Sequence, residues 1–188
     1  MSCFQSEQAP AGNGDACGKN ADTAQLQDQL TGALIGLARA TEGNEHMLSA
    51  STTDAVVEGL FATQTIGNFD GDALLALLDR VEQEKRKLVP DCYHCLSSCG
   101  RTASFDMNKL RNAGEDIRAL KSRILSGIRD LAACARHAAA LGRRDEAIYS
   151  FLYKALIVIG LEDWGTEELL PILLEMDEMH RKCEALLG

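Results

Sequence analysis

Apolar residues recur at steps of three and four over most of the chain beyond residue 20. Such spacing places them on one face of an α-helix. The first run predicts a helix that begins behind Asp22, a residue type that caps helix N-termini, and ends near Gly43. The next two runs predict helices at about residues 51–66 and 73–89.

The same periodicity returns after a turn-rich segment at residues 90–114. It predicts a long helix that ends at Leu141-Gly142 and a largely buried helix that ends at Gly160. A last helix is predicted to open at Trp164-Gly165-Thr166. Pro171 lies in this last run, where it predicts a kink or a later start because proline lacks the backbone N–H that a helix interior uses.

No segment alternates apolar and polar residues with a period of two, so we predict an all-α fold. Three helices on each side of a linker indicate two three-helix bundles of the spectrin type or one elongated helical bundle. The predicted parts are an irregular cysteine-bearing leader at 1–20, a first bundle at 21–89, a cysteine-bearing linker at 90–114 and a second bundle at 115–188.

The composition narrows the classes of partner. Among 188 residues, 28 are acidic and 19 are basic, which gives a formal net charge of −9. Nucleic acids and anionic membranes bind basic surfaces, so we expect neither as a partner. The chain shows no apolar run of membrane-spanning length and no signal peptide, and we therefore expect a cytoplasmic protein. The oligomeric state stays open.

Seven cysteines are not explained by the needs of folding, because a chain of this length can bury a sizeable core without disulfides. Three of them, Cys92, Cys95 and Cys99, form a C-x2-C-x3-C pattern in the linker. Short loops let such thiols converge on one centre, and thiolates are preferred ligands of iron–sulfur clusters and of zinc. The spacing indicates a metal or redox site in this linker.

A closed site needs a fourth ligand, and Cys3 and Cys17 in the leader are the available thiols. His94 would suit zinc better than an iron–sulfur cluster. The spacing leaves three readings open: an iron–sulfur cluster of the 4Fe-4S type, a zinc ion, or plain or disulfide-forming thiols.

The other candidate residues favour structural roles. Cys134 and Cys183 fall on or beside apolar helix stripes, where we expect free thiols that pack in the core. The four histidines are too scattered for a mononuclear site. Acidic residues around Asp70 lack the glycine and the glutamate of a calcium loop, which favours helix capping.

The helix predicted from residue 117 onward is locally basic, and the spread of its basic residues around the helix favours a solvated face over an anion site. These residues are Arg118, Lys121, Arg123, Arg129, Arg136, Arg143 and Arg144. No nucleotide-binding, hydrolase or metalloprotease motif occurs, and no local set of acid, base and nucleophile is present.

Several segments resemble, in order along nearly the whole chain, the first domain of the hybrid-cluster proteins, also called prismane proteins or hydroxylamine reductases. The resemblance opens at Cys3-Phe4-Gln5 and Cys17-Gly18-Lys19. It continues through Gly59-Leu60-Phe61-Ala62-Thr63, Asn68-Phe69-Asp70, Cys99-Gly100-Arg101-Thr102, Glu115-Asp116-Ile117-Arg118-Ala119-Leu120-Lys121, His137-Ala138, Leu141-Gly142, Glu162-Asp163-Trp164 and Glu167-Glu168-Leu169-Leu170-Pro171.

The resemblance implies a helical domain of two three-helix bundles that holds a cubane iron–sulfur cluster on four leader cysteines. Cys3 matches the first of these ligands and Cys17 the last. Ser6 stands at the position of the second, and the third has no counterpart. We therefore do not expect the usual four-thiolate leader site, since serine is a poor substitute for a thiolate toward iron.

The resemblance also implies that the ligands of the family's hybrid cluster lie in later domains, beyond Gly188. The leading expectation is a stand-alone homologue of the helical domain that acts as an iron–sulfur or electron-transfer accessory and not as a complete enzyme. Its partner would be a redox protein or a separately encoded catalytic subunit. The alternatives are a non-catalytic helical interaction module and a remnant of a hydroxylamine reductase, an oxidoreductase.

Overall fold

The computed structural model describes residues 21–64, 70–89 and 103–188, and every regular element in these ranges is helical. This confirms the all-α prediction for the described residues. The α-helices are α1 (Ala21–Thr41), α2 (Ala50–Ala62), α3 (Gly71–Leu88), α5 (Met107–Arg111), α6 (Glu115–Ala140), α7 (Glu146–Gly160) and α8 (Thr166–Leu187), with a 3-10 turn at Glu45–Met47. None of these helices has the length and apolar character needed to cross a bilayer.

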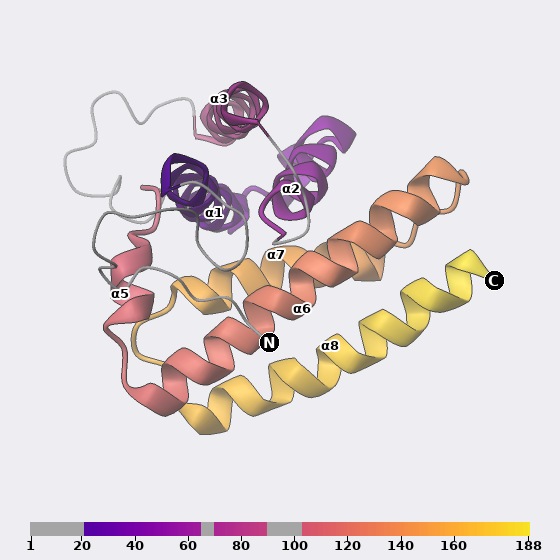
Figure 1. The fold of residues 1–188 in the computed structure, drawn as a ribbon. Coiled ribbons are helices and arrows are strands. Elements are labelled where there is room, and N and C mark those ends of the chain that lie inside the picture. The colour runs from indigo at the N-terminus through magenta and orange to yellow at the C-terminus, as the bar shows by residue number, and fades with distance from the viewer. Residues whose placement is uncertain (1–20, 65–69, 90–102) are drawn as a thin grey trace.

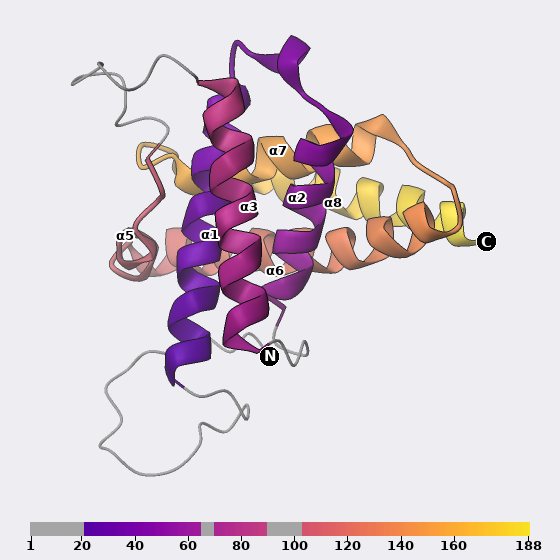
Figure 2. The ribbon, with the colours of Figure 1, turned by 90° about the horizontal axis from the view of Figure 1, so that it is seen from above.

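The long helices form two layers. Helices α1, α2 and α3 pack on one another, and so do α6, α7 and α8. The axes of the first three run across those of the last three, as Figure 1 and Figure 2 show from two directions. The layers meet where α1 contacts α7 and where α2 contacts α6. Below, α1–α3 are called the first layer and α6–α8 the second.

Local capping explains several helix boundaries. The side chain of Ser49 accepts a hydrogen bond from Thr52 N, that of Asp70 from Ala73 N, and that of Asp145 from Ala147 N. These contacts satisfy main-chain N–H groups that a helix N-terminus leaves without partners. Gly43 and Gly142 follow α1 and α6 with φ values of 78° and 74°, a conformation that glycine adopts without a Cβ penalty.

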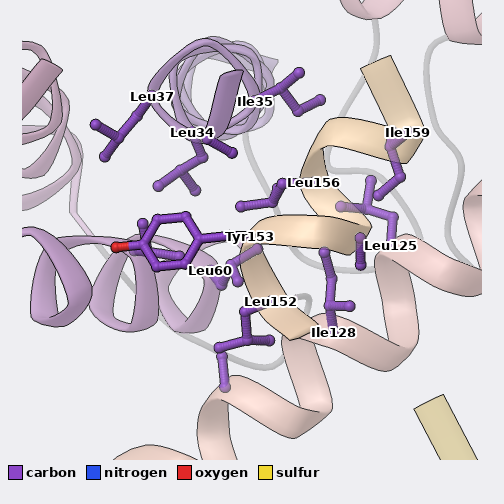
Figure 3. Close-up of a cluster of buried hydrophobic side chains, with 14 of the residues drawn as sticks. Leu34, Ile35, Leu37, Leu60, Leu125, Ile128, Leu152, Tyr153, Leu156 and Ile159 are labelled. Carbon is purple, nitrogen blue, oxygen red and sulfur yellow. The ribbon is translucent and has the colours of Figure 1, made fainter. Parts of the chain in front are cut away.

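One continuous hydrophobic core runs through both layers. Helix α7 lies at its centre, and Leu152, Leu156 and Ile159 on it are at most 1% exposed. Figure 3 shows Leu156 between Leu34 of α1 and Ile128 of α6. Burial of each such side chain is worth roughly 1.5–3 kcal/mol. The two layers therefore share the apolar contacts that stabilise them.

The segment predicted as a linker contains part of this core. Phe105 and the short helix α5 contribute buried side chains, and Phe105 N donates a hydrogen bond of 2.9 Å to Gly32 O in α1. A Cβ on Gly32 would lie 2.3 Å from Phe105 O, so only glycine permits this close approach. The sequence did not predict α5, because five residues are too few to show a helical period.

For α8, the sequence predicted either a kink at Pro171 or a later start of the helix. The helix begins at Thr166, five residues before Pro171, so a later start is wrong. The Glu168 carboxylate accepts a hydrogen bond of 2.9 Å from Gly165 N, which stabilises the first turn ahead of the proline.

Candidate functional site

The five cysteines predicted as ligands, Cys3, Cys17, Cys92, Cys95 and Cys99, lie outside the described residues. Within residues 21–64, 70–89 and 103–188, no three or more His, Cys, Asp or Glu side chains gather in a group that could hold a metal ion. The predicted ligand set therefore stays a prediction, and the described helices provide the scaffold around it.

The two remaining cysteines form a disulfide, which corrects the prediction that both are free core thiols. Cys134 of α6 is bonded to Cys183 of α8, with the two Cα atoms 6.2 Å apart. Cys183 is fully buried, and Cys134 is partly buried against the core. The sequence shows only that both thiols lie near apolar stripes, because pairing across 49 residues depends on how the helices pack. Neither sulfur of this disulfide is a thiolate that could bind a metal.

Two cations cap the C-terminus of α7. Arg39 Nη2 of α1 donates a hydrogen bond to Gly160 O, and Lys121 Nζ of α6 donates one to Leu161 O. A helix C-terminus carries partial negative charge, so it attracts cations. The Arg39 guanidinium also lies 5.6 Å from the centre of the Phe105 ring. This cluster joins α1, α6 and α7.

Lys121 contradicts the prediction that the basic residues of its helix form a solvated face. The residue is only 4% exposed. Burial lowers the pKa of the Lys121 amine, although the nearby charge of Glu162 acts in the opposite direction. The sequence contains a signal for this position: Lys121 lies four residues after Ile117 and three before Ile124, on the apolar stripe itself.

Arg129 is a second inward-facing cation on α6. Its Nε donates to Thr63 Oγ1 at 2.9 Å, and its Nη2 donates to Thr31 Oγ1 at 3.2 Å. Burial lowers the pKa of Arg129 to about 10, while the carboxylates of Asp28 and Asp130 oppose this shift. The guanidinium thus remains charged at neutral pH and ties α6 to α1 and to the end of α2.

Glu84 is a buried carboxylate inside the first layer, with only 3% of the residue exposed. It accepts hydrogen bonds of 2.7 Å from Ser51 Oγ and 3.0 Å from Thr52 Oγ1, both in the first turn of α2. Lys87 Nζ lies 2.6 Å from the same carboxylate. Burial alone would raise the pKa of Glu84, but the three hydrogen bonds outweigh it and hold the pKa below its ordinary value.

The charged groups described above hold neighbouring helices together. The cations donate hydrogen bonds to main-chain carbonyls or hydroxyls, and the Glu84 carboxylate accepts them from hydroxyls and from the Lys87 amine. The capping prediction for Asp70 is confirmed by its bond of 2.7 Å from Ala73 N. His180, one of the scattered histidines, pairs its Nε2 with Gly127 O at 3.0 Å between α8 and α6.

Comparison with known proteins decides the family. The sequence profile of the Prismane/CO dehydrogenase family matches residues 1–187. The chain belongs to this family. The match takes in the five predicted ligand cysteines as well as both helix layers, and so the resemblance inferred from short segments is confirmed over the whole chain.

Curated relatives of this family member are hydroxylamine reductases. That of Syntrophobacter fumaroxidans is 33% identical over 216 aligned positions, which take in all of this chain and 39% of the relative. That of Solidesulfovibrio magneticus is 30% identical, again with 100% of this chain and 39% of the relative. That of Thermodesulfovibrio yellowstonii is 37% identical, with 83% of this chain and 33% of the relative. The chain thus spans less than half the length of the relatives it matches.

Proposed function

We propose that this chain is the helical accessory component of a hydroxylamine-reductase-type redox system and works with a separate protein that supplies the part of the relatives it does not cover. The observation that carries the proposal is the family match over residues 1–187, set against coverage of only 39% of two relatives. The shared core supports it, because the two layers form one packed body.

The chemistry of the available donors fits an iron–sulfur cluster. The disulfide uses Cys134 and Cys183, and the other five of the seven cysteines are the predicted ligands. Cys92, Cys95 and Cys99 would hold the cluster together with Cys17 or Cys3, and zinc is the alternative metal. A bound iron–sulfur cluster supplies a site that accepts and releases single electrons.

Iron and acid-labile sulfide analysis of the anaerobically purified chain tests this ligand set. We expect about four iron and four sulfide per chain in a 4Fe-4S protein, and loss of both in a variant with Cys92, Cys95 and Cys99 changed to serine. The matched control is the Cys134→Ala, Cys183→Ala variant, which removes two cysteines and should keep the iron. A chain that stays free of iron and of charge-transfer absorption after reconstitution would rule the cluster out.

A second candidate function is a non-catalytic helical module that assembles with the same kind of partner. Two observations favour it: serine stands at position 6, where the resemblance expects a ligand, and the hydrophobic core of the described residues is intact. Alanine at all five remaining cysteines distinguishes the two functions. Unchanged partner binding and unchanged thermal stability would support the module and would remove the support for the cluster.

A further inference from the structure

Helix α8 carries apolar residues on two opposite sides. Its inner side is satisfied, because Leu169, Ile172 and Met176 are at most 6% exposed in contact with the core. On the outer side, Leu170 is 52% exposed and Leu174, one helical turn later, is 72% exposed. Single exposed leucines are common. Two in successive turns form an apolar stripe on a helix side that normally carries polar side chains, because it faces water.

The outer stripe consists of Leu170, Leu174 and the exposed Pro171 between them. Among the described elements, α8 packs mainly on α6 and α7, and both contacts use its inner side. In Figure 1 the helix lies along the edge of the second layer. The described fold therefore leaves most of Leu174 and about half of Leu170 uncovered, and this apolar area is available to a partner.

Acidic side chains border the outer stripe. Glu167 lies one turn before Leu170, and Asp177 and Glu178 lie one turn after Leu174; all three are exposed. None of the three forms an ion pair with the described part of the chain, whereas Glu175 nearby is paired with Lys154 Nζ at 2.5 Å. The unpaired charges make the border of the outer stripe negative, with Arg181 a further turn away.

We infer that the outer stripe of α8 is the docking surface for the protein that supplies the missing part of the relatives, through an apolar groove bordered by lysine or arginine. The inference rests on the proposed function for the identity of the partner. In the relatives, more than half of the length lies outside the match, so the matched helical part adjoins further protein. Two leucines would fill the groove and the basic border would pair with the acidic one.

A second copy of this chain fits the outer stripe poorly. In a two-fold pair, the same patch meets itself, and two antiparallel α8 helices would set Glu167 of one copy against Asp177 and Glu178 of the other. Like charges in contact oppose association. The charge pattern therefore favours a basic partner.

Site-specific photo-crosslinking in the cells that encode the chain identifies the occupant. The full chain carries Leu174→p-benzoylphenylalanine, and the matched control carries the same change at Leu141, which is 54% exposed at the end of α6. We expect one crosslinked protein at position 174, absent at 141, whose sequence corresponds to the uncovered part of a hydroxylamine reductase. Capture of a second copy of this chain, or of no protein, overturns the inference.

The captured protein is then purified, and its affinity for variants of the chain tests the apolar stripe and the acidic border separately. The Leu170→Ser, Leu174→Ser variant should raise the Kd at least tenfold, and so should Glu167→Lys, Glu178→Lys, while Leu141→Ser leaves it unchanged. Binding should weaken as salt is raised, because the charged borders are screened. An unchanged Kd in both double variants overturns the inference, since all five positions are exposed and the fold does not depend on them.

The outcome is separable from that of the proposed function. If the chain and the missing part act together but the serine variants bind normally, the accessory role stands and the partner docks elsewhere. If the crosslink forms but the chain carries no iron, the docking surface stands and the cluster does not.

Discussion

In each helix layer a different kind of link joins two of the helices. In the first layer, the buried Glu84 carboxylate joins α3 to the first turn of α2 through hydrogen bonds. In the second layer, the Cys134–Cys183 disulfide joins α6 to α8. One link depends on protonation and the other on the redox state of two thiols. The shared core makes both links act on the same unfolding equilibrium.

The largest effect should come from a residue of the second layer whose side chain faces the first layer. Leu156 is fully buried at the centre of the core, and Leu156→Ala should lower the free energy of unfolding by about 3–4 kcal/mol through lost burial and a cavity. Urea unfolding followed by the fluorescence of the single tryptophan, Trp164, and by far-UV circular dichroism measures it. The two signals should change together.

The control for this change is Leu141→Ala, which removes an exposed side chain and should cost less than about 0.5 kcal/mol. If fluorescence and circular dichroism reported separate transitions, the two layers would unfold independently and would not share one unfolding equilibrium.

The next effect concerns the second layer alone. The Cys134→Ala, Cys183→Ala variant should be less stable than the oxidised chain by about 3 kcal/mol, because the disulfide closes a long loop and restricts the unfolded chain. Addition of a thiol reductant should lower the midpoint of unfolding of the original chain and leave that of the variant unchanged. A reductant that shifts both midpoints equally would show that the disulfide does not provide this stability.

The next prediction concerns the first layer, where the contribution of Glu84 to stability depends on pH. Glu84→Gln should cost about 2 kcal/mol at pH 7, because it removes a charged acceptor of three hydrogen bonds. The folded pKa of Glu84 lies below its ordinary value of 4.5, so its stabilisation is complete above that value and is lost as pH falls through the folded pKa.

Denaturant titrations from pH 7 to pH 3 check this, and the difference in stability between the original chain and the Glu84→Gln variant should shrink at the acid end. Glu82→Gln, which changes a partly exposed ion-paired carboxylate on the same helix, should cost less than about 1 kcal/mol at pH 7. A constant difference across the range would exclude the carboxylate charge as the cause.

The smallest effect compares one cap from each layer. Asp145→Ala removes the N-cap of α7 and Asp70→Ala removes that of α3, and each should cost about 1 kcal/mol. Thermal unfolding measures both. Asp145 also pairs with Lys182 of α8 at 3.2 Å, but the two caps lie in different layers and share no partner. The two losses should therefore add in the double variant, and strong non-additivity would contradict separate roles.

Apolar periodicity was sufficient to predict the six long helices, since residues such as Leu34 and Ile128 repeat on one face over many turns. It could not reveal α5, which is too short to show a period, or the Phe105 contact, which depends on Gly32 far away in the sequence. Lys121 was misassigned because its charge suggested solvent, although its position on the apolar stripe indicated burial.

The cysteines show the same limit. Sequence spacing separates the linker thiols from Cys134 and Cys183, but only the packing of α6 on α8 brings the last two together. The five predicted ligands lie outside the described residues, so their assignment stays a prediction from spacing and from the resemblance.

Hydroxylamine reduction by the reconstituted pair tests the central claim most directly. The chain is mixed with a separately expressed protein that carries the part of a hydroxylamine reductase it does not cover, and oxidation of a reduced dye is followed on addition of hydroxylamine. We expect a rate at least tenfold above the sum of the two proteins alone, and a lower rate with the Leu170→Ser, Leu174→Ser variant. A mixture no more active than its separate parts would contradict it.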